Sequence, residues 1–197
     1  MRRPLGRLEG VAWGRAGLLF VGAWGFAEAI AFPVIPDVAI GLLALVVPRR
    51  AAPMFAALLV GALAGSAVLY GLTLAAPGAV ESMLLALPAI APSMLVEASA
   101  TVADGAPASM AVAGPGTPLK VYTYAWATGP ATPFALAAGV VLNRVTRILP
   151  GVLLLALIGH LAPAFVRRHD GLVLVVYAVA YVVGYAIYWG IVASPWR

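Results

Sequence analysis

Two runs of this chain, residues 54–75 and 172–192, contain no charged side chain at all. A helix of about 20 apolar residues matches the roughly 30 Å of hydrocarbon in a bilayer. Hydrophobic residues make up 63% of the 197 residues and charged residues only 10%, whereas soluble domains are about half apolar and a quarter charged. A soluble fold of this length could not bury so much apolar surface. The sequence therefore predicts an all-α, polytopic integral membrane protein with one membrane domain over residues 1–197.

Two further apolar segments are interrupted by proline. Residues 16–47 contain F-P-V-I-P-D at 32–37, and residues 117–143 contain G-P-A-T-P at 129–133. The legs on either side of these breaks are short. A leg of about 11 residues rises only about 17 Å, half of a bilayer. Non-helical backbone at that depth must be buried in protein or line a wet cavity. We therefore predict two re-entrant hairpins, a pattern typical of transporters with inverted repeats.

The remaining segments complete the predicted topology. Residues 54–75, 149–165 and 172–192 are predicted full spans. Residues 79–116 carry acidic but no basic side chains, which favours helices at the interface or in an external loop. The expected architecture is thus about three full spans with two opposed re-entrant helical hairpins.

The formal net charge of +5 is concentrated at the ends of apolar segments. Such arginine clusters usually mark cytoplasmic ends, so we expect a multi-pass protein of the inner or plasma membrane with a cytoplasmic N-terminus. The clusters have no interleaved aromatic residues, which argues against nucleic acid as a partner. The chain has no cysteine, and no His or acidic pair has ligand spacing on one helix, so we expect neither a metal nor another cofactor. The clusters are Arg2, Arg3, Arg7 and Arg15, then Arg49 and Arg50, then Arg167 and Arg168.

Five ionisable residues lie within or beside the hairpins, where charge is costly and marks a functional site by default. Opposed hairpins would bring the acids and bases together. One interpretation is that they only form ion pairs that hold the hairpins. The other is a polar site for a phosphate headgroup, which guanidinium binds in a fork, or for a proton, which a shielded carboxylate can exchange. The five are Glu28, Asp37, Lys120, Arg144 and Arg147.

Other polar residues have blander interpretations. Four tyrosines between 177 and 188 fall on one helix face, and we expect a packed stripe that ends in an interfacial belt with Trp189 and Trp196. His160 is expected to be packed or interfacial. Ser66 is a nucleophile candidate for a lipid-modifying enzyme with His160 as its partner, but no motif around it supports that chemistry.

The order and spacing of several motifs resemble the DedA superfamily of membrane proteins, also called SNARE-associated or VTT-domain proteins, and in particular its YqaA-like branch. The motifs are W-G-F-A-E with Glu28, P-V-I-P-D with Asp37, the G-x-x-x-x-Y that ends at Tyr70, T-P-L-K-V-Y at 117–122, and R-V-T-R-I-L-P-G at 144–151 followed by Gly159. Three features depart from the family pattern: Asp37 directly follows Pro36, Glu28 is closer to Asp37 than is usual, and Arg144 and Arg147 are closer together than in many members.

The resemblance implies two facing re-entrant hairpins and the transport or scrambling of lipids. On the matching residues, Glu28 and Asp37 would be the membrane acids, and Arg144 and Arg147 the essential basic pair. We therefore expect a transporter or scramblase for a phosphate-bearing lipid, such as a polyprenyl phosphate or a phospholipid, with protons and a second copy of the chain as further partners. A structural or assembly factor without transport is the alternative, and a lipid-modifying enzyme a third reading.

Overall fold

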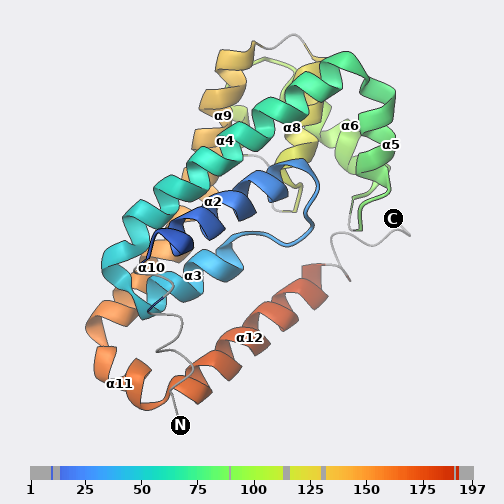
Figure 1. Cartoon of the computed structure of the whole chain (residues 1–197). Helices are drawn as coiled ribbons and strands as arrows, with labels where there is room; N and C mark the ends of the chain where they lie inside the picture. The colour runs from blue at the N-terminus through green and yellow to red at the C-terminus, as the bar shows by residue number, and fades with distance from the viewer. Residues whose placement is uncertain are drawn as a thin grey trace.

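The computed structural model describes residues 14–88, 90–112, 116–129 and 132–188, together with residues 10 and 190. This part of the chain is helical and contains no strand (Figure 1). Three helical segments are long and apolar enough to cross a membrane: Pro48–Ala75, Pro133–Leu161 and Asp170–Ile187. The predicted all-α class is confirmed, and these three helices are candidate membrane spans. The end of the predicted span 172–192 lies outside the described residues.

The first proline-interrupted segment forms two helices, α2 (Arg15–Ile30) and α3 (Asp37–Val46). Between them the chain reverses direction in a loop (Figure 1), as expected where prolines remove backbone donors and restrict the residues before them. The indole Nε1 of Trp24 donates a 2.9 Å hydrogen bond to the carbonyl of Val34 and so holds this loop against α2. At 10 residues, α3 rises only about 15 Å.

Helix α4 (Ala51–Ala75) follows a short 3₁₀ turn, Pro48–Arg50, and packs along α2. The two helices approach closely because glycines meet backbone. A side chain on Gly61 would overlap the carbonyl of Gly22, and one on Gly65 would lie 2.5 Å from the carbonyl oxygen of Phe26. The small-xxx-small spacing thus brings the backbones of two long helices together.

Residues 79–116, which the sequence predicts to lie at the interface or in an external loop, contribute apolar side chains to the helical core. They form α5 (Pro77–Leu85), α6 (Pro92–Thr101) and α7 (Ser109–Val112). Helices α5 and α6 pack against α8 (Leu119–Thr128), and α7 packs against α9 (Pro133–Arg147). Their apolar side chains and those of α8 form one buried cluster, which includes Leu84, Met94, Met110, Tyr122 and Trp126.

The second hairpin is less symmetric than predicted. Its second leg, α9 (Pro133–Arg147), continues into α10 (Leu149–Leu161) after a single residue, so that one 29-residue apolar segment replaces the predicted short leg and separate span at 149–165. Pro150 lies in the first turn of α10, where a missing N–H is tolerated. The N–H of Ile148 still bonds the carbonyl of Arg144 at 3.0 Å, so the helical path is maintained.

The predicted span also ends earlier than expected. The helix stops at Ala162, and Phe165 belongs to a separate helix, α11 (Pro163–Arg168). A short turn then leads into α12 (Asp170–Ile187), which runs beside α3 along one side of the molecule (Figure 1). No residue of α12 is buried, although all other spans have buried residues. Most of the surface of α12 is therefore left for lipid.

The contact between α2 and α4 generates a matched pair of substitutions on one helix. Gly61→Ala should lower the thermal unfolding midpoint in detergent, because overpacking typically costs about 1–3 kcal/mol and here the added carbon meets backbone. Gly71→Ala is the control: its added carbon meets nothing within 4 Å, and alanine is the better helix former. Equal midpoints for the two variants would contradict the close contact of α2 with α4.

Candidate functional site

Glu28 is the centre of a buried charge cluster. It lies on the face of α2 that also buries Gly17, Val21 and Gly25, and only 1% of its surface is exposed. Its Oε2 accepts a hydrogen bond from Arg144 Nη2 of α9, in a buried ion pair. The pair joins residues 116 positions apart in the chain, so it fixes how α2 meets α9.

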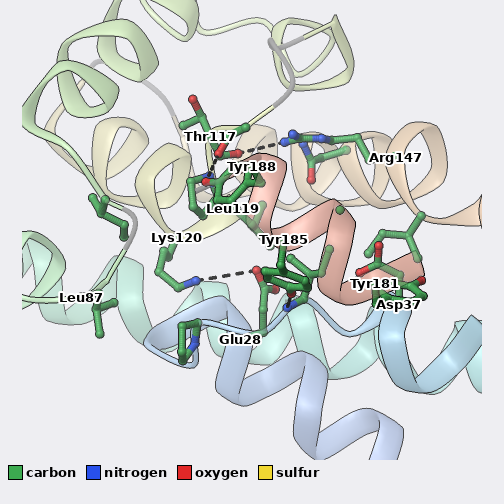
Figure 2. A pocket seen from close by; sticks show the side chains of 18 of the residues that line it. Glu28, Asp37, Leu87, Thr117, Leu119, Lys120, Arg147, Tyr181, Tyr185 and Tyr188 are labelled. Atoms are coloured by element: carbon green, nitrogen blue, oxygen red, sulfur yellow. Dashed lines mark hydrogen bonds and ion pairs between the residues drawn. The ribbon is translucent and has the colours of Figure 1, made fainter. Parts of the chain in front are cut away.

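Lys120 completes this cluster from the first turn of α8. Its ammonium lies 3.8 Å from Glu28 Oε1 (Figure 2). It also donates a 3.3 Å hydrogen bond to the carbonyl of Phe32 in the loop of the first hairpin. Like Arg144, Lys120 is almost fully buried. A buried charge is tolerated only when it is paired and hydrogen-bonded. One glutamate thus serves two cations, and the loop of the first hairpin meets the start of α8.

Arg147 lies one turn beyond Arg144 on α9. Its Nη1 donates a 2.9 Å hydrogen bond to the carbonyl of Thr117, just before α8. The two arginines therefore point to the same region, as their spacing of three residues requires. The Nε of Arg144 is buried with no protein acceptor within hydrogen-bond distance, so part of this guanidinium still has hydrogen-bonding capacity.

Asp37 is in a different situation from Glu28. It is the first residue of α3, and among the described residues it forms no ion pair. Its Oδ1 is buried and has no protein donor within hydrogen-bond distance. Its backbone carbonyl accepts a 3.2 Å hydrogen bond from the hydroxyl of Tyr177. The structure thus places Asp37 near the cluster without pairing its carboxylate.

The four tyrosines of the C-terminal segment face the first hairpin and the start of α8. The hydroxyl of Tyr177 also donates to the carbonyl of Val38 at 2.9 Å, and that of Tyr185 accepts the N–H of Ile35 at 2.8 Å. Tyr188 donates to the carbonyl of Gly116 at 2.6 Å. The predicted packed stripe is therefore a set of hydroxyl-to-backbone contacts that holds α12 over the site. Trp189 and Trp196 lie outside the described residues.

These elements enclose a cavity of about 500 Å³. All five predicted site residues line it, and Figure 2 shows Tyr185 between Lys120 on one side and Asp37 on the other. Three cationic and two anionic side chains thus share one space with apolar walls. The remaining lining residues are Pro33, Ile35, Leu87, Pro88, Ile90, Gly116, Thr117, Pro118, Leu119, Asn143, Ile148, Ala180, Tyr181, Gly184, Tyr185 and Tyr188.

Sequence reasoning missed two walls of this cavity. The tyrosine wall could have been suspected, because four hydroxyls on one helix face exceed what lipid contact needs. The turn between α5 and α6, with Leu87, Pro88 and Ile90, carries no polar signal that could have placed it here. Ser66, the nucleophile candidate, lies elsewhere: it is buried and accepts a 3.4 Å hydrogen bond from Thr123.

Comparison with known proteins adds no assignment to this geometry. No protein-family model matches the sequence, and neither a curated protein nor a solved structure gives a match.

The buried ion pair predicts strong energetic coupling between Glu28 and Arg144. Each single alanine substitution should lower the unfolding midpoint in detergent, because removal of one partner leaves the other charge buried and costs about 3–5 kcal/mol. The double variant should lose much less than the sum, with a coupling energy within about 0.5–3 kcal/mol.

A matched cycle supplies the control. Arg168 is exposed on α11, so Arg168→Ala combined with Glu28→Ala should give additive losses. Additive losses in the Glu28 and Arg144 cycle as well would mean that the two side chains do not pair.

Proposed function

We propose that this protein is an integral membrane transporter or scramblase of DedA type that moves a phosphate-bearing lipid across the bilayer. The observation that carries the proposal is the cavity, in which Lys120, Arg144 and Arg147 gather between helices that are otherwise apolar. Charge in such surroundings is expensive and is kept where it serves a function. A lipid phosphate is an anion that reaches this depth because its chains remain in the bilayer.

The cationic side chains suit a phosphate group. Guanidinium groups bind phosphate in a planar fork, and lysine binds it as a point charge. Arg144 has an unused Nε, and Arg147 lies one turn away on the same helix. A headgroup at this site would compete with Glu28 for Arg144 and Lys120. Without bound lipid, Glu28 pairs with the two cations. When the headgroup binds, its phosphate takes the place of the Glu28 carboxylate.

Proton coupling follows from this competition. When a phosphate takes over the two cations, Glu28 is left as a buried carboxylate without a partner, and a buried carboxylate is more stable when protonated. Glu28, which loses both partners when the headgroup binds, is therefore the acid that the proposal assigns to proton coupling. Asp37 forms part of the polar lining of the same cavity as Glu28.

Of the two proline-interrupted segments, the first is proposed to be re-entrant. In the second, only α8 is short enough to end within the bilayer, because α9 continues into α10 as one apolar segment. The α2–α3 pair starts and ends beside basic residues, and its second leg is too short to cross a bilayer. Pro48 and Arg167 line one small cavity, so the clusters at 49–50 and 167–168 lie at the same end of the molecule. We assign this end, with the N-terminus, to the cytoplasmic side of the inner or plasma membrane.

Single cysteines test this topology, since the chain has none of its own. Ala52→Cys and Ala103→Cys lie on exposed positions near Arg50 and Asp104. An impermeant maleimide added to intact cells should label only the cysteine at 103, and after permeabilisation both. Labelling of both positions from the same side would contradict the proposed orientation.

A structural role without transport is the second candidate. It is favoured by one observation: both oxygens of Glu28 already face cations, so the cluster could serve only to hold α2, α8 and α9 together. Under this reading, variants that remain folded should keep the protein's role in the cell even when the charges are removed.

Transport itself is tested in proteoliposomes by the accessibility of labelled lipid headgroups, with an anionic phospholipid and a polyprenyl phosphate as probes. The wild type should move at least one probe. Glu28→Gln and Arg144→Gln should slow it about tenfold or more, since hydrogen bonds to charged groups contribute about 1.5–3 kcal/mol.

The control variant is Arg168→Ala, which removes an exposed charge outside the cavity and should leave the rate unchanged. Unfolding midpoints separate inactive protein from unfolded protein. If the wild type moves neither probe, or if folded cavity variants match its rate, the transport proposal fails and the structural role stands.

A further inference from the structure

The cavity has two chemically different ends. At one end, Glu28 and the cations Lys120 and Arg144 satisfy one another. At the other end lie Asp37 and Tyr181, with Tyr185 between the two ends (Figure 2). The first end has an excess of positive charge, because one carboxylate faces two cations. The second has a carboxylate and phenol groups, and among the described residues no cation lies within ion-pair distance of that carboxylate.

Pairing within the protein explains Glu28 but leaves Asp37 unexplained. The Oδ1 of Asp37 is buried with no protein donor, and no ion pair joins Asp37 to the arginines in the described part of the chain. A buried acceptor without a donor costs about 1–3 kcal/mol, and more when it is charged. A ligand that supplies a donor at this end would remove that penalty, whereas a ligand with only a phosphate would not.

We propose that Asp37, Tyr181 and Tyr185 form an ammonium subsite, so that the preferred lipid carries both a phosphodiester and a primary ammonium group in its headgroup. This inference rests on the proposed lipid transport. The phosphate lies at Arg144 and Arg147, and the ammonium donates to Asp37 Oδ1 beside the phenol rings. Aromatic faces attract cations, with about 0.5–2 kcal/mol per contact depending on desolvation.

The arrangement of the tyrosines supports this subsite. The ring centroids of Tyr177 and Tyr181 are 4.8 Å apart, and the Tyr177 and Tyr185 hydroxyls are held by the backbone between Ile35 and Val38. The Tyr185 ring is thus held by a backbone group that precedes Asp37 in the chain, and the Tyr177 ring by one that follows it. A preorganised aromatic wall beside an unpaired carboxylate is suited to a cation rather than to an acyl chain.

The subsite discriminates among lipids by charge and by donor capacity. Neither phosphatidylglycerol nor polyprenyl phosphate carries a cation, and phosphatidylglycerol offers the Asp37 carboxylate only neutral hydroxyl donors. Phosphatidylcholine has a cation, but its methylated nitrogen has no N–H to donate. Phosphatidylethanolamine supplies both the charge and the N–H groups, and we therefore expect it to be moved fastest.

The experiment compares these lipids with the label on an acyl chain, which leaves the headgroup intact. Proteoliposomes of the full chain receive trace phosphatidylethanolamine, phosphatidylcholine or phosphatidylglycerol with an acyl-chain fluorophore, and quenching by an impermeant reductant reports movement between leaflets. The wild type should move phosphatidylethanolamine about tenfold faster than phosphatidylglycerol, since one charged hydrogen bond corresponds to that ratio.

Asp37→Asn tests the residue, with the ratio of the two rates as the readout. The ratio should fall to about one, and Asp37→Glu should restore part of it. Asp104→Asn, which removes an exposed acid outside the cavity, should keep the wild-type ratio. Unfolding midpoints of all variants are measured in detergent.

The outcomes separate the two proposals. If the wild type moves phosphatidylglycerol or phosphatidylcholine as fast as phosphatidylethanolamine, lipid transport holds and the ammonium subsite is overturned. The same conclusion follows if folded Asp37→Asn keeps the wild-type ratio or loses movement of all lipids equally. If the wild type moves no lipid, the proposed function itself fails.

Discussion

A carboxylate removed from water is the constraint on which this structure depends. Glu28 can be buried on α2 only because Arg144 and Lys120 approach it from two other helices. Each of the three charges would be costly without the others. The cluster therefore sets the relative positions of α2, α8 and α9, and the loop of the first hairpin is fixed in the same step by the bond from Lys120 to Phe32.

The other walls of the cavity follow from weaker interactions. The turn between α5 and α6 is held by the apolar cluster around Trp126. Helix α12 is held by tyrosine hydroxyls that contact backbone atoms of the first hairpin and of Gly116. Hydrogen bonds of this kind each contribute about 0.5–1.5 kcal/mol. The cavity thus has one side fixed by charge and packing and one side fixed by a few hydrogen bonds.

The sequence predicted the parts of this arrangement that depend on local chemistry. Uncharged runs identify α4 and α12, and the two prolines at 33 and 36 mark the first hairpin, because these features act within a few residues. The five charged residues could be named because charge is rare in apolar segments. Which charges pair could not be derived: Glu28 and Asp37 look equivalent in the sequence, and only the helix contacts distinguish a paired acid from an unpaired one.

Where the sequence misled, a local signal was outweighed by packing. Pro150 marks a break in the pattern at 149, yet the helix continues because the proline falls in a first turn and Ile148 keeps its hydrogen bond. In residues 79–116, Met94 and Met110 are buried against α8 and α9, a contact that the composition of the segment does not indicate. Composition reports the average environment of a segment and not the side chains that anchor it.

The glycine contacts of the first hairpin have a mechanical consequence. α2 meets α4 at Gly61, and α3 meets α10 at Gly159, where an added side chain would overlap the carbonyl of Leu45. Each leg is thus clamped backbone to backbone against a long span, so the hairpin, α4 and α10 behave as a rigid frame. Helix α12 is joined to this frame by hydroxyls and a short corner after Arg168, and it has no buried residue. Among the candidate spans, α12 is therefore the one held in place by the fewest buried contacts.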